Sequence, residues 1–135
     1  QVRMSMIGAS GGSLIVATFN GDTGANYVWH ELNGAGASAA AYSGTSQNYS
    51  RWFGRNVGTS ATYPTVIVAD ILDYANTTKN KVVRDLAGMD ANGSGEVSLT
   101  SSLWLNTAAI TSVTVKTHDG TNFASGTSIS LFGVK

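Results

Sequence analysis

Residues 65–74 read TVIVADILDY, the most strand-like run in the chain. Its Thr, Val and Ile side chains branch at Cβ, and such residues favour a pleated and largely buried position. Two further strand-like runs follow, Lys81–Met89 and Glu96–Leu105, and the polar segment Asp90–Gly95 between them has the composition of a turn. The middle of the chain therefore predicts consecutive β-strands joined by tight turns.

The same alternation of apolar and polar residues extends to the N-terminal part of the chain. Val2–Ile7, Leu14–Phe19 and Tyr27–Leu32 each predict a strand. Residues 20–22 (Asn-Gly-Asp) interrupt the pattern, and Asn-Gly is a strong turn dipeptide. We therefore interpret this polar cluster as turn geometry rather than as a chemical site.

The remaining segments complete an all-β pattern. Residues 33–64 are rich in Gly, Ala and Ser and predict a long loop with one short strand near Arg51–Arg55. Strand patterns return at Ala108–Lys116 and Thr127–Lys135, and helical periodicity is absent. About eight antiparallel strands predict a two-sheet sandwich of the jelly-roll type. An immunoglobulin-like sandwich is the alternative, although the chain has no cysteine for the usual Cys–Trp–Cys core.

Length and charge limit the classes of protein. A chain of 135 residues suits a single sandwich domain over residues 1–135, and a strand pattern that begins at residue 2 predicts further sequence upstream. Eight Lys and Arg balance eight Asp and Glu, so the chain lacks the positive field that attracts nucleic acid or an anionic membrane. Charged residues make up 12% of the chain, about half the usual share. The low charge indicates either a surface partly covered by partners or a polar Ser- and Thr-rich surface of the kind that also occurs on monomeric β-proteins.

Two motifs associated with reactive or metal sites occur without their usual context. Residues 8–12 (GASGG) have the spacing of a nucleophile elbow around Ser10, but a strand rather than a helix follows them. Residues 90–96 (DANGSGE) resemble the first half of a calcium loop, but the twelfth position is Ser101 and the flanks predict strands. A hairpin turn explains the second motif better. The alternative is a weak ion site formed by Asp90, Asn92 and Ser94.

The histidines and the central acids also favour structural roles. His30 and His118 are the only histidines, and their positions predict no zinc site. Asp70 and Asp73 lie three residues apart in one predicted strand, so they point to opposite faces and form no catalytic pair. We expect Asp70 to pair with a cation of the neighbouring strand, namely Lys79, Lys81 or Arg84. The sequence therefore predicts no catalytic residue, no cofactor and no metal ion.

One cluster combines aromatic residues with arginine. It contains Tyr49, Arg51, Trp52, Phe53 and Arg55. Aromatic residues and arginine are enriched at the centres of protein interfaces, which predicts that this cluster is an interface. The alternative of equal weight is that Trp52 and Phe53 close an open end of the sandwich. Stacking of a sugar or a nucleobase on the cluster is a weaker third hypothesis.

Three segments, in chain order, resemble motifs of tailed-bacteriophage virion proteins. The first is residues 19–22 (FNGD) with Gly24, Asn26, Tyr27 and His30. The second is residues 70–77 (DILDYANT) followed by Lys79 and Lys81. The third joins residues 108–113 (AAITSV) with residues 130–135 (SLFGVK). The resemblance covers nearly the whole chain and implies a jelly-roll-like domain that decorates a capsid or forms part of a tail or fibre. It implies no catalytic residues, and members usually carry a further N-terminal strand region.

The sequence thus predicts a non-enzymatic bacteriophage structural protein of the virion, most simply a capsid decoration (cement) protein. Its expected partners are copies of itself, with a trimer fitting a capsid site, and other virion proteins such as the major capsid protein. The first alternative is a carbohydrate- or receptor-binding domain of a tail or fibre, in which Trp29, Trp52 and Trp104 stack on sugar rings. The second is a hydrolase that uses Ser10 or the scattered carboxylates.

Overall fold

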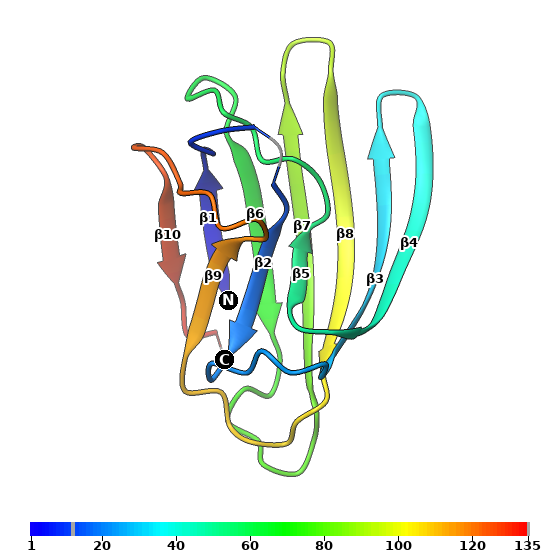
Figure 1. Ribbon diagram of the computed structural model, residues 1–135, viewed down its shortest axis with the longest axis vertical. Coiled ribbons are helices and arrows are strands. Elements are labelled where there is room, and N and C mark those ends of the chain that lie inside the picture. The colour runs from blue at the N-terminus through cyan, green and yellow to red at the C-terminus, as the bar shows by residue number, and fades with distance from the viewer. Residues whose placement is uncertain (12, 135) are drawn as a thin grey trace.

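The chain folds into two antiparallel sheets that face each other, as the computed structural model shows for residues 1–11 and 13–134 (Figure 1). These described residues form ten strands and no helix. Seven strands form one sheet, in the order β10-β1-β6-β7-β8-β3-β4, and three form the other, in the order β5-β2-β9. The strands are β1 (Val2–Met6), β2 (Ile15–Phe19), β3 (Tyr27–Ala35), β4 (Ser38–Gln47), β5 (Ser50–Phe53), β6 (Thr65–Ile71), β7 (Lys81–Asp90), β8 (Gly95–Trp104), β9 (Val113–Thr117) and β10 (Ser128–Leu131).

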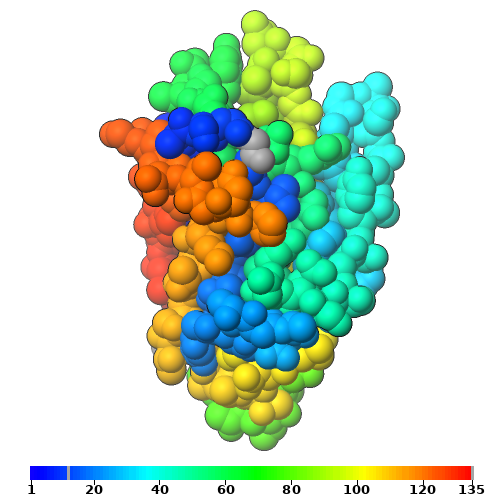
Figure 2. All heavy atoms as spheres, viewed as in Figure 1, coloured from blue at the N-terminus to red at the C-terminus, as the bar shows by residue number. Residues whose placement is uncertain are grey.

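The small sheet covers one face of the large sheet, which we call the inner face. In Figure 1, β9, β2 and β5 lie in front of the seven strands. Figure 2 shows that these strands and their connecting loops cover the middle of that side, while the tips of the β7–β8 and β3–β4 hairpins extend beyond them. The other face of the large sheet, which we call the outer face, has no second layer among the described residues.

Alternate residues of the large sheet form the core together with the whole of β2. All five residues of β2 are buried, since this strand lies in the middle of the small sheet. Phe19 packs against Trp104 with ring centroids 5.6 Å apart. Trp52 and Phe53 are fully buried from β5. The aromatic residues therefore fill the space between the sheets, where large flat side chains bury most apolar area.

The turn that precedes β3 is held by the Asp22 carboxylate. Asn20 and Gly21 have φ values of 52° and 71°, the left-handed conformation that Asn and Gly adopt most readily. Asp22 then accepts hydrogen bonds from the Gly24 amide at 2.8 Å and from the Trp104 indole at 2.7 Å. The hydrogen bond from Trp104 lowers the pKa of Asp22. The cluster therefore ties a turn to the core, and the prediction that it is turn geometry agrees with these contacts.

The all-β sandwich expected from the sequence is confirmed, with differences in detail. Ten strands form among the described residues instead of about eight, and their division into seven and three is more unequal than a regular eight-stranded jelly roll suggests. The long loop expected over residues 33–64 is wrong, because β4 pairs with β3 along Ser38–Gln47. The last strand ends at Leu131 rather than Lys135, which lies outside the described residues. In the part of the chain that the structure covers, no helix is long and apolar enough to cross a membrane.

Candidate interaction surface

The outer face of the large sheet carries an apolar surface that none of the described residues covers. Val68, Leu86, Leu99 and Leu32 are direct neighbours on β6, β7, β8 and β3 and form one cross-strand row. The next row consists of Val66, Gly88, Val97 and Gly34. On the far side of the first row lie a polar row (Asp70, Arg84, Ser101 and His30) and another apolar row (Val82, Leu103 and Val28).

The leucines and valines of this face are strongly exposed. The exposed fraction is 62% for Leu32, 55% for Leu86 and 53% for Leu99. Between β3, β4, β7 and β8 the face is hollowed into a shallow groove of ≈ 460 Å³, whose lining includes His30, Leu32 and Leu99. An antiparallel sheet that meets water on one side usually alternates apolar residues inside with polar residues outside. Here two adjacent rows of the outer side are apolar, so this part of the face has the character of an interaction surface.

The inner face shows the opposite anomaly, because charged side chains lie between the sheets. Thr100 on β8 is flanked by Glu31 on β3 and Asp85 on β7, and all three are at most 2% exposed. Arg51 on β5 reaches this group, with its Nε 2.7 Å from Glu31 Oε2. Among the described residues, neither carboxylate oxygen of Asp85 has a hydrogen-bond partner.

Burial shifts the ionisation of these acids. Desolvation raises the pKa of Glu31, and the positive charge of Arg51 opposes that rise. Desolvation raises the pKa of Asp85 well above its usual range, the nearby Thr100 hydroxyl opposes the rise, and the charge of Glu31 adds to it. Raised carboxyl pKa values are common at functional sites. These two acids are only 2% exposed, so the burial of their charges affects the stability of the fold.

The predicted interface cluster is divided between core and surface. Trp52 and Phe53 are fully buried in the core cluster, so in this protomer their side chains offer no surface to a partner. Arg51 is turned inward, with its guanidinium 4.2 Å above the Trp29 ring and a hydrogen bond to the Gly54 carbonyl. The prediction of an interface therefore depends on the two remaining members of the cluster, Tyr49 and Arg55. Tyr49 is half-buried and edge-on to His118, and Arg55 is exposed with its Nε 3.3 Å from Glu96 Oε1.

The residues considered for catalysis do not come together. Ser10 is exposed in a loop before β2, and no helix follows it. His30 lies on the outer face and His118 lies in a turn after β9. The described part of the chain contains no group of three or more His, Cys, Asp or Glu side chains that could hold a metal ion.

The expected ion pair of Asp70 does not form. Asp70 instead accepts a hydrogen bond from the Gln1 side chain at 2.9 Å. Lys79 pairs with Asp73 at 3.1 Å, and the buried Lys81 amine donates to the carbonyls of Lys79 and Thr107. Arg84 lies beside Asp70 in register, yet no ion pair of Arg84 occurs among residues 1–11 and 13–134. Of the three cations expected beside Asp70, only Arg84 lies on the outer face next to it, and the two side chains form no ion pair there.

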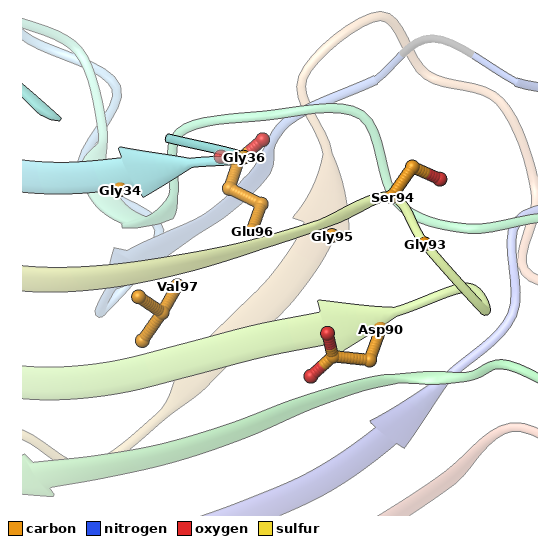
Figure 3. Close-up of a pocket in the computed structure, with 8 residues that line it drawn as sticks. All are labelled: Gly34, Gly36, Asp90, Gly93, Ser94, Gly95, Glu96 and Val97. Atoms are coloured by element: carbon orange, nitrogen blue, oxygen red, sulfur yellow. The ribbon is translucent and has the colours of Figure 1, made fainter. Parts of the chain in front are cut away.

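The calcium-like segment is a hairpin turn. Asn92 and Gly93 have φ values of 46° and 105°, and Ala91 donates a backbone hydrogen bond to Ser94 at 2.7 Å, as in the tight Asn-Gly turns that join antiparallel strands. A hollow of ≈ 310 Å³ lies beside this turn (Figure 3). Figure 3 shows Glu96 directed toward Gly36, with Asp90 lying apart from it. The acidic side chains of the segment thus do not converge on one point.

The tryptophans that could stack on a sugar are all inside the protein. Trp29 is 5% exposed, Trp104 is 1% exposed and Trp52 is fully buried. They therefore form no platform for a sugar ring. Comparison of the chain with protein-family models, with curated proteins and with solved structures finds no match.

Proposed function

We propose that this chain is a non-enzymatic structural protein that works by adhesion to other protein surfaces through the outer face of its large sheet. The observation that carries the proposal is the contiguous apolar surface on that face, where Leu32, Leu86 and Leu99 each expose more than half of their area. Contiguous exposed apolar patches larger than a few hundred Å² mark interaction sites. In a protein without partners, such a surface would leave apolar area in contact with water and would favour aggregation.

The resemblance to tailed-bacteriophage virion proteins supplies the setting. In that setting the chain is a capsid decoration protein, bound to copies of itself and to the major capsid protein. A standard protein interface buries roughly 1,600 Å². Symmetry repeats each contact many times over a particle, so modest individual interfaces together resist the internal pressure of packaged DNA without any chemistry.

Two further observations support adhesion over the alternatives. Candidate reactive groups such as Ser10 and His118 lie on separate loops, which favours a protein without a catalytic site. The receptor-binding alternative needs exposed flat aromatic side chains in a row, and its three tryptophans are buried. The exposed tyrosines lie on different elements, with Tyr42 on β4 and Tyr74 after β6.

The proposal is tested by measuring how many copies of the chain are present in particles of the phage whose genome encodes it. Quantitative mass spectrometry of purified particles is expected to find the chain in a simple whole-number ratio to the major capsid protein. Particles that lack it are expected to release DNA at a lower temperature than complete particles. Absence of the chain from particles refutes the proposal, and a few copies per particle places it in the tail instead of on the capsid.

A further inference from the structure

The outer face has the features of one half of a symmetric interface. We propose that a second copy of this chain covers it, with the two outer faces packed against each other about a two-fold axis. The axis lies in the interface, parallel to the strands, between β7 and β8. The inference deepens the adhesive function proposed above by naming the partner. It rests on three properties of the face: steric self-complementarity, polar self-complementarity and area.

The axis places strand opposite strand in a way that matches apolar side chains. It sets β7 opposite the partner's β8 and β6 opposite the partner's β3, while each cross-strand row keeps its height. Leu86 then faces Leu99 of the partner subunit, and Val68 faces Leu32 of the partner subunit. Each contact occurs twice, as an isologous interface requires. Two sheets packed face to face normally keep their strands within about 30° of each other, which this arrangement satisfies.

The glycines of the outer face supply the recesses that such packing needs. In the proposed dimer Gly88 faces Val97 of the partner subunit, and Val66 faces Gly34 of the partner subunit. The protomer itself gives no reason for glycine at position 34. Its φ is not positive, and a Cβ there would meet only the Val97 Cγ1 atom at 3.5 Å, an ordinary contact. Glycine weakens a strand, so this recess is explained by a partner that fills it.

The polar row also matches itself across the axis. Asp70 faces His30 of the partner subunit, which sets a carboxylate acceptor opposite an imidazole that can donate. Arg84 faces Ser101 of the partner subunit. No like charges lie directly opposite each other in this arrangement, so the polar row sets the register without repulsion between facing groups.

The area is sufficient for a stable dimer. Four strands face each other across the axis, with β7 opposite the partner's β8 and β6 opposite the partner's β3. The first pair overlaps over about ten residues and the second over about seven, so with strands about 4.8 Å apart and about 3.3 Å per residue each copy contributes roughly 540 Å². Two copies therefore bury roughly 1,100 Å², which exceeds the roughly 1,000 Å² expected of a biological interface. Most residues that line the shallow groove, among them Leu32 and Leu99, lie within this area.

The first experiment measures self-association of the purified chain by sedimentation equilibrium. A dimer is expected at concentrations from about 1 to 100 µM. Leu99→Glu is expected to raise the dissociation constant by at least about 100-fold, since it replaces two buried leucines per dimer with charges. Leu131→Glu is the matched control. This residue is 75% exposed on the opposite side of the same sheet, so its substitution is expected to leave the dimer intact.

A second variant keeps the test independent of folding. Gly34→Val fills a recess without adding charge and suits a strand, and its Cβ meets only the Val97 Cγ1 atom of the protomer, at an ordinary 3.5 Å. It is expected to raise the dissociation constant of the dimer by about 10-fold. Its effect on the protomer is measured by adding it to the Leu99→Glu variant, which is expected to be monomeric, and the urea midpoint is expected not to fall. A monomer at about 100 µM, a trimer, or a dimer indifferent to both Leu99→Glu and Gly34→Val overturns the inference.

Cross-linking tests the orientation, because the chain contains no cysteine. In the proposed dimer Val68 faces Leu32 of the partner subunit, whereas the two copies of either residue lie three strand spacings apart, roughly 14 Å along the sheet. A mixture of Val68→Cys and Leu32→Cys proteins is expected to cross-link with a short bis-thiol reagent, whereas each variant alone is not. Cross-linking of Val68→Cys alone, or none in a mixture that sediments as a dimer, overturns the two-fold axis. A dimer of a chain absent from phage particles would refute the proposed virion function and leave this inference standing.

Discussion

The buried ion pair between Arg51 and Glu31 predicts that loss of Arg51 alone destabilises the protein strongly, and that replacing both residues restores most of the stability. Arg51→Met removes the guanidinium that lies 2.7 Å from a Glu31 carboxylate whose side chain is 0% exposed. Breaking a buried ion pair by removing one partner costs about 3–5 kcal/mol, because the remaining charge is left unpaired in the interior. The loss of the contact with the Trp29 ring acts in the same direction. A loss of this size is a large part of the roughly 5–15 kcal/mol that stabilises a typical domain.

Urea unfolding followed by tryptophan fluorescence measures this cost, at one protein concentration for all variants because association adds to stability. The double variant Glu31→Leu/Arg51→Met is expected to recover to within about 1 kcal/mol of the unchanged protein. Replacement of a whole buried pair by apolar groups is often neutral. An Arg51→Met cost below about 1 kcal/mol, or a double variant no more stable than Arg51→Met alone, refutes the reasoning.

The pH dependence supplies an independent check on the same pair. Burial already raises the pKa of Glu31, and removal of Arg51 takes away the positive charge that opposes the rise. A carboxyl group whose pKa is higher in the folded state contributes stability below its unfolded pKa, about 4.3, and loses that contribution as the pH rises through the folded value. The cost of Arg51→Met is therefore expected to be smaller at pH 4 than at pH 7. A cost that does not change with pH contradicts the assignment of the unpaired charge to Glu31.

Two further carboxylates give predictions of opposite sign. Burial raises the pKa of Asp85 well above its usual range, so Asp85→Asn is expected to raise the free energy of unfolding at pH 7 by roughly 1–3 kcal/mol. Near pH 3 the substitution is expected to change the free energy little, because Asp85 is protonated in both the folded and the unfolded protein. A loss of stability at pH 7 contradicts this prediction. Asp22→Ala is expected to cost roughly 1–3 kcal/mol, because it leaves the buried Trp104 indole without its acceptor. The control Asp73→Ala removes an exposed ion pair with Lys79 and is expected to change the free energy of unfolding by less than about 0.5 kcal/mol. Equal losses of stability from Asp22→Ala and Asp73→Ala contradict the role of Asp22.

The strands that the sequence predicts well are those whose local composition agrees with their place in the sheet. The run TVIVADILDY forms β6, although the strand ends at Ile71 because the next residues turn toward β7. The segment Ser38–Gln47 reads SAAAYSGTSQ and contains few residues that favour strands. It nevertheless forms β4, because the free edge of β3 offers it eight paired positions. Pairing with β3 therefore outweighs the local composition of this segment, and that pairing cannot be predicted from the composition alone.

The interaction surface was harder to predict because the alternation of β7 is ambiguous. Lys81, Val83 and Asp85 point to one side, and Val82, Arg84 and Leu86 point to the other. Each side of β7 carries both charged and apolar residues. The alternation therefore identifies a strand, but it does not show which side faces the core. The inward side is decided by β5, which brings Arg51 to the charged residues of the inner face. That contact joins segments distant in the sequence and has no local signature.

The inverted character of the two faces connects the core to the proposed dimer. Polar groups such as Asp85 and Lys81 occupy the interior, where they cost stability, while Leu86 and Leu99 lie outside, where a lone protomer gains little from them. Only three strands cover a sheet of seven, so a single copy buries little beyond the inner face. In the proposed dimer, a second copy on the outer face turns the leucine row into a second core. That dimer would give one physical explanation for the few charges of the sequence, its exposed leucines and its recess at Gly34.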